Sequence, residues 1–172
     1  MLINDGVPTK EDIDKICPTP ERFDKGPVAI VECFQKIPCD PCVKACKRGA
    51  ITMPNDINDL PVVDSESCNG CGLCISMCPG LAIFVVDMTY SDEMALVRLP
   101  YEYVPVPELG QMVMGLDRGG NDLGQFKVVK ATSGGKKNMT YTISLAVPQN
   151  LAMTLRGIYV RENDGICGGC SK

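Results

Sequence analysis

One cysteine-rich stretch limits what this chain can fold into more than any other feature. Residues 68–79 read CNGCGLCISMCP, so three thiols lie at intervals of three residues and a fourth follows just before a proline. Cysteines at this spacing are typical ligands of a [4Fe–4S] cluster, and the fourth cysteine of such a run ligates the other cluster of a pair. The run therefore predicts a second set of cysteines elsewhere in the chain.

A second run of cysteines lies upstream, with the spacing Cys-x5-Cys-x2-Cys-x3-Cys. Its last three members each precede a cysteine of the later run by 32 residues. The three pairs are Cys39 with Cys71, Cys42 with Cys74, and Cys46 with Cys78. A constant offset of this kind indicates an internal repeat, here of one cluster-binding unit.

The rule that the fourth cysteine crosses over assigns eight cysteines to two [4Fe–4S] clusters. Site 1 takes Cys33, Cys39, Cys42 and Cys78, and site 2 takes Cys46, Cys68, Cys71 and Cys74. Small residues between the ligands, such as Gly70 and Gly72, leave room for backbone N–H groups to point at the sulfurs. The alternative is zinc held by four thiolates at each site, because Cys-x2-Cys pairs also suit zinc. The continuous run favours iron–sulfur.

The first run fits the pattern less closely than the second. Five residues separate Cys33 from Cys39, and Lys47 stands where a proline usually follows the fourth cysteine. A longer loop still reaches a cluster, since insertions cost little loop entropy. One intact cluster beside a degenerate site is the alternative. Three basic residues lie beside site 2 in the sequence: Lys44, Lys47 and Arg48. They are interpreted as raising the potential of the site 2 cluster, as marking a docking surface, or as a solvated charged turn.

Three cysteines lie outside the two runs. Cys167 and Cys170 form a Cys-Gly-Gly-Cys pair with only two residues after it, too few for the helix of a thioredoxin-like motif. The pair is interpreted either as two ligands of a metal or shared [2Fe–2S] site completed by another chain, or as free thiols on a mobile tail. Cys17 is interpreted as an isolated small hydrophobe.

Composition excludes several classes of function. The chain has no histidine, so histidine acid–base chemistry and histidine metal ligation are absent. Its net charge of −4 argues against a nucleic-acid surface. The apolar run at residues 81–86 is far shorter than the roughly 20 residues that cross a bilayer, so no membrane span is expected. No apolar signal segment opens the chain, and with reduced thiols we expect a cytoplasmic protein.

The sequence predicts an α+β fold in four segments. They are an N-terminal arm at 1–26, a two-cluster domain at 27–90, a small β-rich docking domain at 91–162 and a Cys-x2-Cys tail at 163–172. The two-cluster domain is expected to contain two β-α-β units. In the arm, Thr9 is the expected N-cap of a short helix at residues 11–16.

The segment from about residue 94 alternates apolar and polar residues, which predicts an antiparallel β-barrel or sandwich. Val97, Leu99, Tyr101 and Tyr103 are expected on one face, as are Tyr141, Ile143, Leu145 and Val147 on a later strand. Asn150 is expected to cap a short turn that ends at Gly157, and residues 158–160 to form the last strand.

The two cysteine runs resemble those of the dicluster [4Fe–4S] ferredoxin family over residues 27–90, which implies a ferredoxin-like fold. The stretch GPVAIVECFQKIPCDPC at 26–42, followed by a β-rich extension, is similar to the ferredoxin subunits of multisubunit flavin-dependent dehydrogenases of amino acids such as proline or hydroxyproline. The resemblance implies a hetero-oligomer in anaerobic metabolism, in which a flavoprotein oxidises the substrate and iron–sulfur subunits pass electrons to other carriers.

The expected function is therefore electron transfer, as a subunit of an oxidoreductase complex and not as an enzyme on its own. Three alternatives stay open: a zinc-stabilised interaction module, a freely diffusing dicluster ferredoxin, and a complete oxidoreductase. The last would need a bound flavin or nucleotide, and no nucleotide-binding fingerprint occurs in the sequence.

Overall fold

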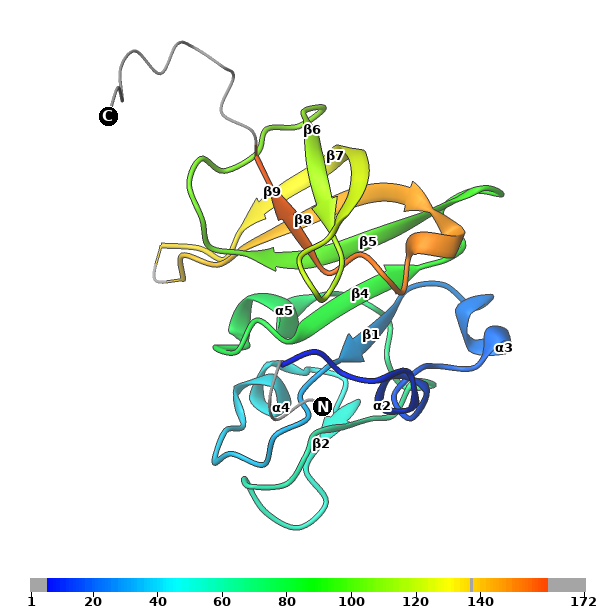
Figure 1. Ribbon diagram of the computed structural model, residues 1–172. Coiled ribbons are helices and arrows are strands. Elements are labelled where there is room, and N and C mark those ends of the chain that lie inside the picture. Colours follow the sequence, from blue (N-terminus) through cyan, green and yellow to red (C-terminus); the bar gives the residue numbers. More distant parts are fainter. Residues whose placement is uncertain (1–5, 137, 161–172) are drawn as a thin grey trace.

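A computed structural model describes residues 6–136 and 138–160 (Figure 1). Its main element is a seven-stranded antiparallel sheet with the strand order β1-β4-β5-β8-β7-β6-β9. The strands are β1 (Val28–Val31), β4 (Ile83–Asp87), β5 (Met94–Tyr101), β6 (Met112–Leu116), β7 (Asp122–Ser133), β8 (Tyr141–Pro148) and β9 (Gly157–Tyr159). A separate two-stranded sheet pairs β2 (Ile51–Thr52) with β3 (Val62–Val63).

The helices are all short. They are α2 (Lys10–Asp14), α3 (Pro20–Phe23), α4 (Pro41–Ala45), α5 (Leu73–Met77) and the 3₁₀ helix η1 (Gln149–Leu151). The two cysteine runs share one order of elements, strand then helix then strand, as β1-α4-β2 and β3-α5-β4. No helix within the described residues is both long and apolar enough to cross a membrane.

Strands β1 and β4 are buried on both faces, which explains why their sequences, VAIV and IFVVD, are almost entirely apolar. On one face Val28 and Ile30 join the core inside the large sheet. On the other face Ala29 and Val31 pack with the cysteines of α4 and α5. These two strands therefore separate the β-core from the cysteine sites and support both.

The large sheet continues across residue 90, where β4 pairs with β5 from Val85↔Arg98 to Asp87↔Leu96. The predicted segments 27–90 and 91–162 thus share one sheet. The predicted alternation of buried and less buried residues is confirmed in β5, where Val97, Leu99 and Tyr101 are buried.

The prediction for Tyr103 is wrong. Its side chain is 71% exposed, because β5 ends at Tyr101 and the alternation ends with it. In β8, Ile143, Leu145 and Val147 are buried as expected.

The sheet curls until its two edge strands approach each other at one end, where three charged side chains meet. Glu32 follows β1, and Arg156 precedes β9. The Glu32 carboxylate accepts hydrogen bonds from Arg156 Nε at 2.6 Å and from Arg118 Nε and Nη2 at 2.8 and 2.6 Å. The Arg156 guanidinium also lies 4.8 Å from the centre of the Phe84 ring. This buried cluster links both edges of the sheet.

The described part of the N-terminal arm, residues 6–26, packs on the body of the protein. Thr9 caps α2 as predicted: its hydroxyl accepts from the Asp12 N–H, and the Asp12 carboxylate accepts from the Thr9 N–H. Helix α3 begins after Thr19 with a proline and buries Arg22 and Phe23.

Near the C-terminus, the predicted cap at Asn150 is wrong. Asn150 lies inside η1, and the residue that precedes this 3₁₀ helix is Pro148. Proline has no polar side chain that could accept a hydrogen bond, so η1 has no side-chain cap. The last strand, β9, ends at Tyr159, one residue before the predicted end.

Candidate iron–sulfur sites

The two short helices carry equivalent cysteines at equivalent positions. Cys42 and Cys74 are the second residues of α4 and α5, and both are buried. Cys46 and Cys78 are the C-caps of the same helices and have extended backbone conformations. The chain therefore leaves each helix at its last cysteine, so this cysteine is free to turn away from the ligands that precede it.

The structure brings the predicted ligands of site 2 together. Cys68, Cys71 and Cys74 from the second run line one cavity with Cys46, which comes from the first run. Ala29, Ile51 and Gly72 are among the other residues that line it. The four thiols thus share one partly open cavity with mostly small and apolar walls.

The ligands predicted for site 1 also lie together. Cys33, Cys39 and Cys42 line a second cavity with Cys78 from the second run. Val31, Ile83 and Met53 lie in the apolar part of its wall. Cys39 is held from outside by its own N–H, which donates to the Ile57 carbonyl at 3.0 Å. Each cavity thus contains three cysteines of one run and the last cysteine of the other.

Backbone N–H groups donate hydrogen bonds to cysteine sulfurs at both sites. At site 2, Cys68 Sγ accepts from the Gly70 N–H at 3.5 Å, as the sequence predicts, and from Ala29 at 3.4 Å. Cys46 Sγ accepts from Ala50 at 3.2 Å. At site 1, Cys78 Sγ accepts from Ala82 at 3.5 Å. For Gly72 the structure shows another role: it precedes α5 with a positive φ of 83°.

Burial keeps several of these thiols neutral in the absence of metal. It raises the pKa of Cys33 and of Cys42, and it raises the pKa of Cys74 to about 12. Only the thiolate binds metal. Metal binding must therefore displace these protons, and the affinity of the sites for metal should rise with pH.

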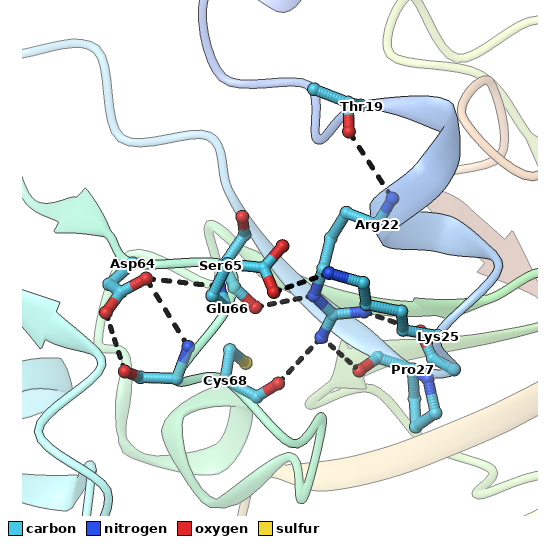
Figure 2. Close-up of polar contacts among 10 residues, drawn as sticks. Thr19, Arg22, Lys25, Pro27, Asp64, Ser65, Glu66 and Cys68 are labelled. Atoms are coloured by element: carbon cyan, nitrogen blue, oxygen red, sulfur yellow. Dashed lines mark hydrogen bonds and ion pairs between the residues drawn. The ribbon is translucent and has the colours of Figure 1, made fainter.

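Two arginines that the sequence analysis did not single out hold the loop of site 2. Arg22 of α3 is 4% exposed and donates to the carbonyls of Cys68, Pro27, Gly26 and Ser65 (Figure 2). Arg98 of β5 donates from Nη1 to the Gly70 carbonyl at 2.8 Å. The Thr19-Pro20 pair, a capping signature, indicates helix α3 but gives no sign of what Arg22 contacts.

Charged side chains differ between the two cavities. Arg48 lines site 2, whereas Asp59 lines site 1 and has Lys36 Nζ at 3.4 Å. Lys44 pairs with Asp40 at 3.0 Å. Of the three basic residues noted in the sequence, Arg48 is therefore the one that reaches the wall of site 2.

Gly70 fits only because it has no side chain. Its φ is +62°, and a Cβ there would lie 2.5 Å from Pro27 Cβ and 2.6 Å from the Pro27 carbonyl carbon. Gly49 has nearly the same φ, +65°, but has nothing within 4 Å. Substitution of Gly49 would therefore test backbone strain alone, whereas substitution of Gly70 would test strain together with steric overlap.

We expect Gly70→Ala to cost about 2–5 kcal/mol, because strain of about 1–2 kcal/mol adds to overpacking of about 1–3 kcal/mol. Gly49→Ala should cost only the strain. Thermal unfolding followed by circular dichroism gives both values. Equal decreases in melting temperature for the two variants would show that the contact with Pro27 does not affect stability.

Two groups of predicted residues remain. Cys17 is exposed and lines neither cavity, so its interpretation as an isolated small hydrophobe stays a prediction. Cys167 and Cys170 lie outside the described residues. Within residues 6–136 and 138–160, no three Cys, Asp or Glu side chains converge in the way that ligands of a single metal ion do.

A family model of the 4Fe-4S dicluster domain matches residues 37–82. This part of the chain is therefore similar to dicluster ferredoxin-type domains, which supports binding of 4Fe–4S clusters. The match includes seven of the eight predicted ligands, and Cys33 lies just before it. No curated protein and no solved structure matches the chain.

Proposed function

We propose that the chain holds two [4Fe–4S] clusters in a ferredoxin-like domain and transfers electrons as the iron–sulfur subunit of an oxidoreductase complex. The observation that carries the proposal is the pair of cavities, each lined by three cysteines of one run and the last cysteine of the other. This is the exchange of ligands expected for paired cubane clusters.

The residues of this chain hold the clusters and set their surroundings. The eight thiolates are the ligands, the N–H groups of Ala29, Ala50, Gly70 and Ala82 donate to ligand sulfurs, and apolar side chains shield both cavities. Each cluster, when bound, supplies a one-electron redox centre. Hydrogen bonds, nearby charge and burial tune its potential, within a span of about −700 to +450 mV.

Zinc fits the pattern of cysteines less well than a cubane. Zinc sites usually take their ligands as separated Cys-x2-Cys pairs. Residues 68–79 instead form one continuous Cys-x2-Cys-x2-Cys-x3-Cys-Pro run, which is the spacing of 4Fe–4S ligands. The match of residues 37–82 to a 4Fe-4S dicluster domain supports the same choice.

The partner that we propose is a flavoprotein dehydrogenase. This part rests on the resemblance of residues 26–42 to subunits of proline- and hydroxyproline-type dehydrogenase complexes. In such an assembly the flavoprotein oxidises the substrate, and this chain, in the cytoplasm, relays electrons to further carriers. We expect no substrate turnover by the isolated chain, which distinguishes it from a complete oxidoreductase.

Metal analysis tests the cluster assignment directly. After anaerobic purification the protein should be brown and contain about eight iron atoms and about eight labile sulfides per chain, as two [4Fe–4S] clusters require. About four of each would support the alternative of one intact cluster. A colourless protein with stoichiometric zinc would overturn the proposal, and purification of the native assembly would identify its partners.

A further inference from the structure

A large open groove adjoins site 2 but lies outside the cluster cavity. It lies between the start of α5 and the outer face of β5, β8 and β7, and its wall mixes apolar, hydroxyl and basic side chains. Its wall includes Cys71, an exposed ligand of site 2, together with Arg98 and Lys130. The groove thus joins a cluster ligand to a part of the sheet that no cluster needs.

The strand register explains why polar groups gather here. Arg98, Ser144 and Lys130 are partners across three neighbouring strands, so their side chains share one face of the sheet. Thr142 and Thr132 form the next row on the same face. The opposite face of these strands carries the apolar core. The outer face carries Arg98, Lys130 and the threonine hydroxyls, beside Leu96.

The charge of the groove is opposite to that of the whole molecule. The chain has a net charge of −4, yet none of the described residues that line the groove is acidic. Arg98 donates to the Gly70 carbonyl, and within the described part of the chain neither Arg98 nor Lys130 forms an ion pair. An acidic partner would be repelled by most of the surface and attracted here.

We propose that this groove is the docking surface for an acidic segment of a redox partner protein. The inference deepens the proposed function and rests on it. A partner seated in the groove would lie against Cys71 and so next to site 2. Site 2 is then the point at which electrons leave or enter the subunit.

A protein suits the groove better than a small redox cofactor. None of the described residues in its wall is aromatic, so a flavin or nicotinamide ring would have nothing to stack on. Exposed apolar side chains lie at this groove. Leu73 lines it, and Asn138, between β7 and β8, donates a hydrogen bond to Met77 Sδ. Arginine and methionine are enriched in protein interfaces.

The test uses flavodoxin, a small acidic flavoprotein, as a defined probe. Its affinity for the anaerobically prepared holoprotein is measured by titration calorimetry at low salt. Lys130→Glu should raise the Kd roughly tenfold, and Lys130→Arg should leave it near the wild-type value. Lys10→Glu, a matched charge reversal on exposed α2, should change it less than about twofold. The differences in Kd between the variants should shrink at about 0.5 M salt, because salt screens the charges.

Carbodiimide crosslinking locates the contact independently of affinity. Mass spectrometry of the crosslinked complex should find Lys130 joined to a flavodoxin carboxylate, and Lys10 should not be joined. Equal weakening by the two charge reversals, absence of binding to wild-type protein, or crosslinks that avoid Lys130 would each overturn the docking surface. None of these outcomes changes the iron content, which tests the proposed function. A failed docking surface can therefore be distinguished from a failed cluster assignment.

Discussion

Replacing Cys78 by serine should remove the cluster of site 1 and leave that of site 2 in place. Cys78 belongs to the second run in the sequence, but its side chain lines the cavity of Cys33, Cys39 and Cys42. The hydroxyl of serine does not replace a thiolate as a ligand of the cluster. We therefore expect iron to fall from about eight to about four atoms per chain, as measured on anaerobically purified protein.

Double variants show which site each cysteine serves. Adding Cys39→Ser to Cys78→Ser should leave iron near four, because both residues serve site 1. Adding Cys71→Ser instead should bring iron close to zero, since the second site is then lost as well. The reverse pattern would mean that each run ligates its own cluster. Cys17→Ser is the control and should retain all the iron.

Much of the site could be predicted because its information is local in the sequence. Thiols three residues apart in a loop can surround one cluster whatever the rest of the fold does. The 32-residue repeat then places Cys46 and Cys78 at the same position, the C-cap, of two equivalent helices. In the same way Thr9 and Asp12 form their capping box within a single helical turn.

The long-range contacts could not be predicted from the sequence. Arg22 reaches Cys68 across 46 positions, and Arg156 reaches Glu32 across 124. A single arginine in an arm or turn looks like an ordinary solvated charge until the fold supplies its partner. The apolar runs of β1 and β4 indicated burial, but not that one face meets a β-core and the other meets the cysteines.

Glu32→Gln should lower stability by about 3–5 kcal/mol, because it leaves two arginines without their counter-charge inside the protein. The side chain of Arg156 is 4% exposed and that of Arg118 is 16% exposed. For a chain of this length the loss corresponds to a fall of roughly 6–20 °C in melting temperature. Circular dichroism of the holoprotein at one fixed scan rate measures it. Glu66→Gln is the control, since its ion pair with Lys25 is exposed and should matter little.

The loss caused by Glu32→Gln should depend on pH in a defined direction. Burial disfavours the charged form of Glu32, but hydrogen bonds and charge from Arg118 and Arg156 outweigh it and hold the pKa of this carboxyl below its ordinary 4.5. A lowered pKa contributes stability that is complete above the ordinary pKa and is lost as pH falls through the folded-state pKa. The gap between wild type and Glu32→Gln should therefore be constant near neutral pH and narrow in acid. A gap that is small at neutral pH, or one that widens in acid, would show that the carboxylate does not link the two edges of the sheet.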